Sequence, residues 1–405
     1  MAIDNKDKKV LKSSIEREQN EVACSAECEK IKGSKNLNVP HLRFPEFSGE
    51  WEMVSLQDIA TINPKSDPLQ NTFIYIDLEA VEKGELRKIQ EIMREEAPSR
   101  AQRVIDNNDI LFQCVRPYQK NNYIHRILNT SNQQWVASTG YAQIRTTELP
   151  NYIYHLLNTD EFNRKVMVRC TGSSYPAINS EDLATIHLYY TPDKKEQLKI
   201  SRLLDLLDKR IATQNKIIEK LQSLIKGLRV CCMQRVYGNN VYLSEIAQIY
   251  QPRTISSTEL TEDGFLVYGA NGIIGKYKDY NHETEQICIT CRGNTCGMVN
   301  YTKPMSWITG NAMVINTDKY QDKVCKRYLY HYLSAYNFNS IISGSGQPQI
   351  VRTPLEKLKI TLPTISEQKQ KAIIFDKIQD KIDINHKVLN LYIGQKQYLL
   401  RQMFI

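Results

Sequence analysis

The chain lacks several features that would place it in a common class of protein. Its 405 residues hold no apolar run of about 18 residues, so no transmembrane helix is expected. The lysine-rich stretch 1–10 has no apolar segment of the kind found in secretory signals. The ten cysteines are scattered without the spacing of a disulfide framework, which is typical of a reducing compartment. We therefore expect a cytoplasmic protein without a membrane anchor.

Sequence motifs for catalysis and nucleotide binding are also missing. The chain has no Walker A sequence. The glycine-containing stretch 269–275 departs from G-x-G-x-x-G, and we interpret it as a turn. The tripeptide at 63–65, Asn-Pro-Lys, lacks the second proline and the aromatic residue of the adenine-methylase motif. We predict no catalytic residues in this chain.

Two groups of residues resemble metal or acid-base sites but favour a plainer interpretation. Cys288, Cys291 and Cys296 have no second C-x-x-C pair nearby, so buried free thiols are expected rather than a zinc site. His155 and His331 lie among Tyr and Leu in predicted short helices, which favours packing or polar-surface roles over base catalysis. No metal site is predicted.

The most informative feature is an internal repeat with a period of about 170 residues. Several short motifs return in the same order, so chance is a poor explanation. The repeat establishes architecture, and an ordinary duplicated enzyme would show it equally well. The matching pairs are residues 56–60 with 243–247, 138–142 with 308–312, 152–157 with 328–333, 172–178 with 344–350, and 196–197 with 367–368.

The repeat divides the chain into two mixed α/β regions, each followed by a long helix. We name the regions head 1 (residues 39–193) and head 2 (residues 237–364). Proline-free stretches at 194–236 and 365–405 predict the two helices, and residues 1–38 form a charged tail. The fold class is therefore α+β, with two pseudo-symmetric heads and two long helices that pair antiparallel as a coiled coil.

Each predicted long helix has an apolar stripe with alternating spacings of four and three residues, which is typical of a coiled coil. Gln214 interrupts the first stripe and Asn385 the second, both near the middle of their helices. In an antiparallel pair the midpoints meet, so we hypothesise that these amides approach each other and fix the helix register. The alternative is two solvated polar residues at a frayed seam.

The chain is mildly basic, with a formal net charge of +8 and a pI of about 8.8. This balance permits nucleic-acid binding without demonstrating it. Residues 194–235 hold eleven basic side chains against four acidic ones. Such a helix could underlie bound DNA or contact a partner protein, and a solvated helix face fits equally well.

Several segments of the chain resemble specificity subunits of type I restriction-modification systems. The first is VPHLRFPEFSGEW at 39–51, with Leu-Gln-Asp-Ile at 56–59. The second is Tyr-Gly-Ala-Asn-Gly at 268–272. The third is the repeated proline and Glu-Gln pair before each long helix, at 192–197 and 363–368. The resemblance covers residues 39–405. The tail at 1–38, with Cys24 and Cys28, has no match in the family pattern.

This resemblance implies a function in which two unlike heads each bind one half of a bipartite, asymmetric site on double-stranded DNA. The antiparallel helices would separate the heads, so that their length sets the gap between half-sites. Two modification subunits that methylate adenine and two restriction subunits with endonuclease and translocase activity would bind this chain. S-adenosylmethionine, ATP and Mg²⁺ would belong to those partners, and this chain would bind no cofactor.

Candidate DNA-binding residues are those whose side chains suit base edges or phosphates and that cluster in polar loops. Each is equally compatible with a solvated surface role. In head 1 the candidates are Arg94, Ser99, Arg100, Arg103, Arg116, Tyr118, Lys120, Ser173, Ser174 and Tyr175. In head 2 they are Tyr268, Asn271, Lys276, Arg292, Asn294, Ser345, Gln347 and Gln349.

Two other functions remain open from the residues alone. A DNA methyltransferase or nuclease with unrecognised motifs would transfer methyl groups or cut DNA as the purified chain. A coiled-coil adaptor without a DNA role would bind no duplex in a salt-sensitive manner.

Overall fold

The fold is described by a computed structural model of residues 38–126, 133–234, 236–270, 272–344 and 346–405. The chain divides into two units, each with one head and part of both long helices. Unit 1 comprises Met1–Leu207 and Gly394–Ile405, and unit 2 comprises Asp208–Ile393. Residues 1–37 of the predicted tail lie outside the described residues.

Head 1 contains a four-stranded sheet of order β2-β11-β8-β9 and another of order β6-β3-β10-β7. Strand β1 pairs antiparallel with β12, and β4 pairs with β5. The strands are β1 (Glu52–Ser55), β2 (Ala60–Ile62), β3 (Thr72–Ile76), β4 (Val81–Glu82), β5 (Glu85–Leu86), β6 (Gln90–Met93), β7 (Ala101–Ile105), β8 (Ile110–Gln113), β9 (Tyr123–Ile124), β10 (Gln134–Ser138), β11 (Tyr141–Thr146) and β12 (His187–Tyr190).

Head 2 contains a sheet of order β14-β20-β17-β18, a sheet of order β16-β15-β19, and the pair β13-β21. The strands are β13 (Asn239–Tyr242), β14 (Gln248–Tyr250), β15 (Phe265–Gly269), β16 (Gly272–Tyr277), β17 (Ile287–Thr290), β18 (Val299–Tyr301), β19 (Ser306–Ile308), β20 (Ala312–Asn316) and β21 (Lys359–Leu362).

The two heads share the strand order of one four-stranded sheet. The order β2-β11-β8-β9 in head 1 is repeated as β14-β20-β17-β18 in head 2, and all neighbours in both sheets are antiparallel. Each second sheet contains one parallel pair, β3 with β10 among the four strands in head 1 and β15 with β19 among the three in head 2. Strands β8 and β17 are fully buried, as their near-continuous apolar sequences predict. The duplication inferred from the sequence is therefore a duplication of fold.

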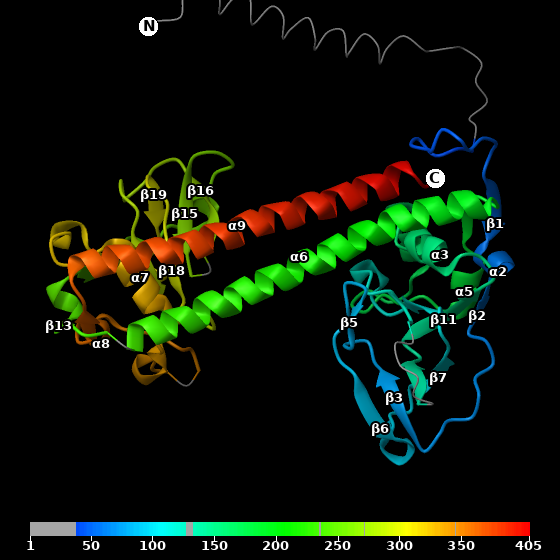
Figure 1. Cartoon of the computed structure of the whole chain (residues 1–405), viewed down its shortest axis with the longest axis horizontal. Coiled ribbons are helices and arrows are strands. Elements are labelled where there is room, and N and C mark those ends of the chain that lie inside the picture. Colours follow the sequence, from blue (N-terminus) through cyan, green and yellow to red (C-terminus); the bar gives the residue numbers. More distant parts are fainter. Residues whose placement is uncertain (1–37, 127–132, 235, 271, 345) are drawn as a thin grey trace, which may run out of the picture. The chain divides into compact units, whose positions relative to one another are not determined.

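In each unit a short helix of the head lies beside a long helix, α3 beside α6 and α7 beside α9 (Figure 1). No helix within the described ranges is both long and apolar enough to span a bilayer. The α-helices are α2 (Leu56–Ile59), α3 (Pro150–Leu157), α4 (Asp160–Arg169), α5 (Ser180–Ala184), α6 (Lys194–Gln234), α7 (Lys326–Ala335), α8 (Arg352–Glu356) and α9 (Ile365–Gln402), and the 3₁₀ helices are η1 (Arg94–Glu96), η2 (Pro117–Gln119), η3 (Leu243–Glu245), η4 (Ser257–Glu259), η5 (Asp318–Tyr320) and η6 (Phe338–Ile341).

Within unit 2 the long helices α6 and α9 lie side by side and run in opposite directions (Figure 1). Their apolar stripes meet in a cluster built around Ile225, Phe375 and Ile382. The Gln214 amide donates hydrogen bonds to the side-chain oxygen and, at 3.2 Å, to the backbone carbonyl of Asn385. The two amides are therefore in contact, and their role in fixing the helix register remains a prediction.

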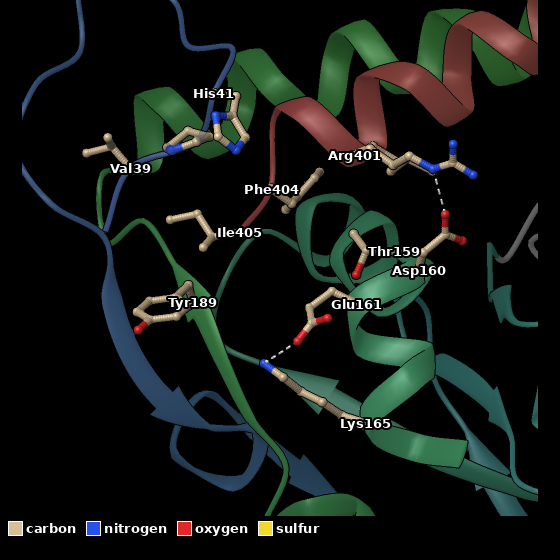
Figure 2. Close-up of a pocket in the computed structure, with 12 residues that line it drawn as sticks. Val39, His41, Thr159, Asp160, Glu161, Lys165, Tyr189, Arg401, Phe404 and Ile405 are labelled. Carbon is tan, nitrogen blue, oxygen red and sulfur yellow. Dashed lines mark hydrogen bonds and ion pairs between the residues drawn. The ribbon is translucent and has the colours of Figure 1, made fainter. Parts of the chain in front are cut away.

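In unit 1 the end of α9 packs against head 1. The Gln402 carbonyl accepts the backbone N–H of Leu42 at 2.8 Å. The Phe404 ring lies 6.0 Å from the Trp51 ring and 5.6 Å from the Tyr152 ring, measured between centroids. A cavity of about 500 Å³ lies beside this contact, between the segment after Asn38, α4 and the end of α9 (Figure 2). Head 1 therefore draws part of its core from residues near 400.

A buried histidine in head 1 leads to a testable pH dependence. The His125 side chain is 0% exposed and lies 4.9 Å from the Trp135 ring, and neither of its ring nitrogens has a hydrogen-bond partner among the described residues. Burial lowers the pKa of His125 to about 4, because the charged imidazolium loses its hydration. The unfolded chain therefore binds a proton below about pH 6.5 that the folded head does not bind until about pH 4.

We expect the His125→Phe variant to lose less folding stability than the wild type as the pH falls from 6.5 to 4. At the acid end of this window the difference between the two proteins in lost free energy of unfolding should approach about 3 kcal/mol, because each pKa unit corresponds to 1.36 kcal/mol. Urea unfolding of the full chain, followed by tryptophan fluorescence at pH 7.5 and pH 4.5, measures it for both proteins. Equal pH slopes in the wild type and the variant would show that His125 binds its proton equally well in both states.

Candidate nucleic-acid interface

In head 1, the loop at 171–177 lies beside the segment that follows strand β8. The backbones of Thr171 and Ala177 exchange two hydrogen bonds of 2.9 Å, which close the loop. Arg116 donates its backbone N–H to the Pro176 carbonyl at 2.7 Å and so connects the loop to the strand end. The polar loop and the basic segment, which are far apart in sequence, are therefore neighbours.

Head 2 repeats the same arrangement at 343–349. Ser343 and Gln349 exchange backbone hydrogen bonds of 2.9 and 2.8 Å. Gly293, in the segment after strand β17, donates its backbone N–H to Pro348 at 2.9 Å. The two heads thus present the same backbone frame, which we call the loop frame, with different side chains on it.

One glycine in each loop frame is required by the backbone. Gly172 has φ +88° and Gly344 has φ +93°, in the region that L side chains rarely adopt. A Cβ on Gly172 would lie 3.0 Å from the Tyr175 carbonyl oxygen, and one on Gly344 would lie 2.5 Å from that of Gln347. These glycines set the path of the loop that displays the candidate side chains.

Three of the predicted residues in head 1 line a single cavity of about 800 Å³. They are Arg100, Arg116 and Tyr175. The Arg116 guanidinium carbon lies 4.3 Å from the centre of the Tyr175 ring, within the range of a cation–π contact. This contact holds the guanidinium in place while its N–H groups remain available. The rest of the lining is formed by Leu78, Glu79, Gln113, Val115, Gln119, Thr139 and Gly140.

Arg116 adopts a backbone conformation that is costly for a non-glycine residue. Its φ of 56° and ψ of 54° are left-handed, as is Lys120 at the other end of η2. The corresponding position in head 2 is Gly293, with φ +84°. A left-handed L residue costs about 1–2 kcal/mol, and such conformations cluster at functional sites. The presence of arginine in this costly conformation favours a role for its side chain.

The remaining candidates in head 1 lie outside this cavity. Lys120 forms an ion pair with Asp160, at 2.8 Å between Nζ and Oδ1, so its charge is partly neutralised. Arg94 donates to the Leu69 carbonyl at 3.3 Å. Arg103 is half-buried, and its Nε has no hydrogen-bond partner among the described residues. Burial lowers its pKa, because it disfavours the charged guanidinium. Besides Arg94, the exposed candidates outside the cavity are Ser99, Tyr118, Ser173 and Ser174.

In head 2 the loop frame brings four exposed candidates together. Arg292 forms an isolated β-bridge with Gln349. Lys276 lies elsewhere, 3.4 Å from Asp263. Tyr268 is only 5% exposed, and its hydroxyl accepts the backbone N–H of Lys303 at 3.1 Å, so it forms part of the core. Asn271 and Ser345 lie outside the described residues. The four exposed candidates are Arg292, Asn294, Gln347 and Gln349.

The cavity in head 1 also includes polar residues that the sequence analysis did not select. Gln113 is buried and donates to the Val115 carbonyl at 2.7 Å and to the Gln119 side chain at 2.9 Å. Gln119 is exposed and lies in the same short segment as Arg116. Its position between candidate residues at 116–120 was therefore enough to predict Gln119 as a candidate from the sequence. Glu79 had no such signal, because it reaches the cavity only through tertiary folding.

The three cysteines that resemble a metal site, at 288, 291 and 296, lie in head 2. Cys288 and Cys291 are free and buried, and burial raises the pKa of the Cys288 thiol to about 12. No cluster of three or more His, Cys, Asp or Glu side chains that could hold a metal ion occurs in the described ranges.

The fold and the loop frames together define a class: a duplicated protein whose two heads share a backbone and differ in the side chains they display. Comparison with known sequences gives the family. The model of the type I restriction modification DNA specificity domain matches residues 48–223 and 239–391, which is more than half of the chain. This chain belongs to that family of specificity subunits.

Individual relatives match over shorter stretches. The Escherichia coli type I restriction enzyme EcoprrI specificity subunit is 31% identical over 147 residues, covering 35% of this chain and 36% of that protein. The Haemophilus influenzae type I restriction enzyme HindI specificity subunit is 23% identical over 187 residues, covering 45% and 37%. The alignments therefore span little more than a third of the length of these curated relatives.

Two solved structures share the fold at low sequence identity. The S subunit of the type I restriction-modification system from M. genitalium has a TM-score of 0.62 and 15% identity, covering 91% of this chain and 99% of that one. A chain from a structure describing complex assembly and conformational transition of the type I R-M system has a TM-score of 0.55 and 19% identity, covering 89% and 98%.

Proposed function

We propose that this chain is the DNA-recognition subunit of a type I restriction-modification complex and has no catalytic centre of its own. Each head binds one half of a bipartite, asymmetric site on double-stranded DNA. The observation that carries this proposal is the repeated loop frame. Two loop frames with the same backbone hydrogen bonds and different side chains are suited to reading two different short sequences.

The side chains on the loop frames have the chemistry that base reading requires. Arginine can donate two hydrogen bonds to guanine, and glutamine can pair in the same way with adenine. Arg116 on the first frame and Gln347 and Gln349 on the second are exposed enough to do so. The serines at 173 and 174 are suited to phosphate oxygens, which take half or more of the hydrogen bonds in protein–DNA contacts.

We propose that the modification subunits bind the long helices and the heads. In unit 2 large apolar side chains on α6 and α9 point away from the helix seam and are 39–72% exposed. Large exposed apolar side chains on a helix pair support a protein–protein contact there. The exposed side chains are Ile217, Leu224, Ile373, Ile374, Ile384 and Leu391.

We assign the chemistry of the complex to its other subunits. Two modification subunits would bind S-adenosylmethionine and methylate adenine, and two restriction subunits would use ATP and Mg²⁺. We also propose a cytoplasmic location, which is supported by the free cysteines at 114, 170, 231, 232, 288, 291, 296 and 325.

Methylation mapping tests this proposal. The chain is expressed with the modification subunit encoded beside it, and adenine methylation is mapped across the host genome. We expect a motif of two short, unlike halves separated by a fixed gap, and exchange of head 2 should change one half only. Methyl transfer or DNA cleavage by the purified chain alone would instead identify an enzyme.

Substituting Arg116 tests its role in reading one half-site. In Arg116→Gly the left-handed backbone is relieved while the guanidinium is lost, so stability should stay within about 1 kcal/mol of the wild type. Discrimination at one position of one half-site should fall by about 1–3 kcal/mol, which is roughly 5- to 150-fold. Methylation of a library with that half-site randomised measures the effect.

The matched variant in head 2 is Gln347→Ala, which should relax the other half-site only. A uniform loss of methylation over all sequences in either variant would indicate phosphate contact in place of base contact.

A further inference from the structure

Each head is attached to a long helix through a buried glutamine at the start of that helix. In unit 1, Gln197 of α6 accepts the backbone N–H of Leu149, the N-cap residue of α3, at 3.2 Å. In unit 2, Gln368 of α9 accepts the backbone N–H of Cys325, the N-cap residue of α7, at 2.8 Å. Gln197 also donates to the Thr191 carbonyl, and Gln368 donates to the carbonyls of Lys323 and Pro363.

A buried histidine forms a second attachment in each unit. His155 of α3 lies with Nε2 2.8 Å from Oδ1 of Asp205 on α6. His331 of α7 lies with Nε2 2.8 Å from Oδ1 of Asp376 on α9. Both imidazole side chains are 0% exposed. These are therefore directional contacts inside the head–helix interface.

A third side chain, four residues before each histidine, binds the same aspartate. Asn151 donates to Asp205, and Arg327 donates to Asp376 at 2.9 Å through Nε. Although burial opposes ionisation, the hydrogen bonds from His331 and Arg327 lower the pKa of Asp376. Asp376 is therefore charged and is hydrogen-bonded to both Arg327 and His331.

The two sets occupy equivalent positions in the repeat. We call them junction 1 (Gln197, Asn151, His155 and Asp205) and junction 2 (Gln368, Arg327, His331 and Asp376). The histidine returns 176 residues later, and at the same spacing the position of Asn151 is taken by Arg327. The glutamine and the aspartate on the long helix return 171 residues later. The repetition of these contacts in two heads whose other side chains differ argues against a chance contact.

Junction 2 also contacts the other long helix. Arg229 of α6 donates to Nδ1 of His331, at 2.8 Å from its terminal nitrogen. Because a guanidinium can only donate, Nδ1 accepts and the proton on Nε2 points to Asp376. His331 therefore connects α6, α7 and α9 within unit 2. In junction 1 the Nδ1 of His155 has no partner among the described residues.

We propose that the junctions hold each head at a fixed angle on its long helix and so determine which gap between half-sites the complex accepts. The glutamine and the aspartate are eight residues apart, about 12 Å along the helix axis at 1.5 Å per residue. One attachment would allow the head to swivel, whereas two separated attachments with directional hydrogen bonds do not. Apolar packing alone tolerates small rotations, which on DNA would bring a neighbouring base pair into register.

This inference rests on the proposed function, and the junction residues are positioning residues that touch no DNA. The test uses the chain in complex with its modification subunit. Substrates contain both half-sites with the native gap, or with a gap one base pair longer or shorter. The readout is the ratio of methylation at altered gaps to methylation at the native gap, which a purely structural role would not change.

We expect Gln368→Leu to raise this ratio by about tenfold, and the double variant Gln368→Leu with Asp376→Asn to raise it further. Each change removes hydrogen bonds of a buried or charged group. The matched pair in unit 1 is Gln197→Leu with Asp205→Asn, both on α6. Leu355→Ala is the control: Leu355 is fully buried in head 2 and lies outside junction 2, so the variant should lower methylation at every gap equally.

The outcomes separate clearly. An unchanged ratio in folded junction variants would overturn the inference, as would failure of every junction variant to fold while Leu355→Ala folds by circular dichroism. A wild-type complex that methylates no bipartite site would instead overturn the proposed function itself.

Discussion

Removal of one heptad from each long helix should shorten the gap between the two methylated half-sites by about three base pairs. The segments to delete are 215–221 in α6 and 378–384 in α9, which face each other in unit 2, where Leu221 and Ile378 share one apolar cluster. Seven residues correspond to about 10.5 Å of helix, and a base pair rises about 3.4 Å. Both half-site sequences should stay the same, because the heads are untouched.

The heptad deletion preserves the apolar stripe and the contact between Gln214 and Asn385, which makes it a mild change for the helix pair. Deletion from α6 alone is the control. It leaves the two stripes out of register, so methylation should fall at every gap. Retention of the native gap by the double deletion would show that helix length does not set the distance between half-sites.

The second large effect is expected from a single methyl group on the loop frame of head 2. In Gly344→Ala the new Cβ would lie 2.5 Å from the Gln347 carbonyl oxygen, in a backbone region that costs alanine about 1–2 kcal/mol. The loop must change its path, which moves Gln347 and Gln349. We expect loss of recognition of one half-site, with the other half-site still read by head 1.

Gly346→Ala is a matched control in the same loop. An added Cβ there has no atom within 4 Å among the described residues, and Gly346 is not among the glycines with positive φ. This variant should methylate the native motif as the wild type does. If both variants lose the same half-site, the loop tolerates no side chain at either glycine. The positive φ of Gly344 would then not be the cause of the loss.

The sequence allowed the long helices and their polar interruptions to be predicted, because a coiled-coil pattern depends only on spacing along one chain. The contact between Gln214 and Asn385 followed from their positions at the midpoints. The loop frames were partly predictable too, since the glycine at 172 and at 344 is a local requirement. The pairing of each loop with the strand end at 114–116 or 291–293 was not, because strand order depends on contacts distant in sequence.

The candidate residues show the same limit. Tyr268 looked suitable for DNA because it precedes a turn, yet its ring fills the core of head 2. Lys120 lies in a basic segment, but folding places Asp160 beside it. His155 and His331 gave no sign of their aspartate partners in their own helices. The repeated spacing of Asp205 and Asp376 was the available signal, and it becomes meaningful only when the helices are placed.

The packing of Phe404 against Trp51 and Tyr152 has a consequence for synthesis. Unit 2 is one continuous stretch of chain, whereas unit 1 needs residues 394–405 to complete its core. On the ribosome, head 1 emerges before head 2, but its apolar surface stays uncovered until residues 394–405 have been translated. We therefore expect the second half of the protein to mature before the first, and nascent head 1 to be the species most in need of a chaperone.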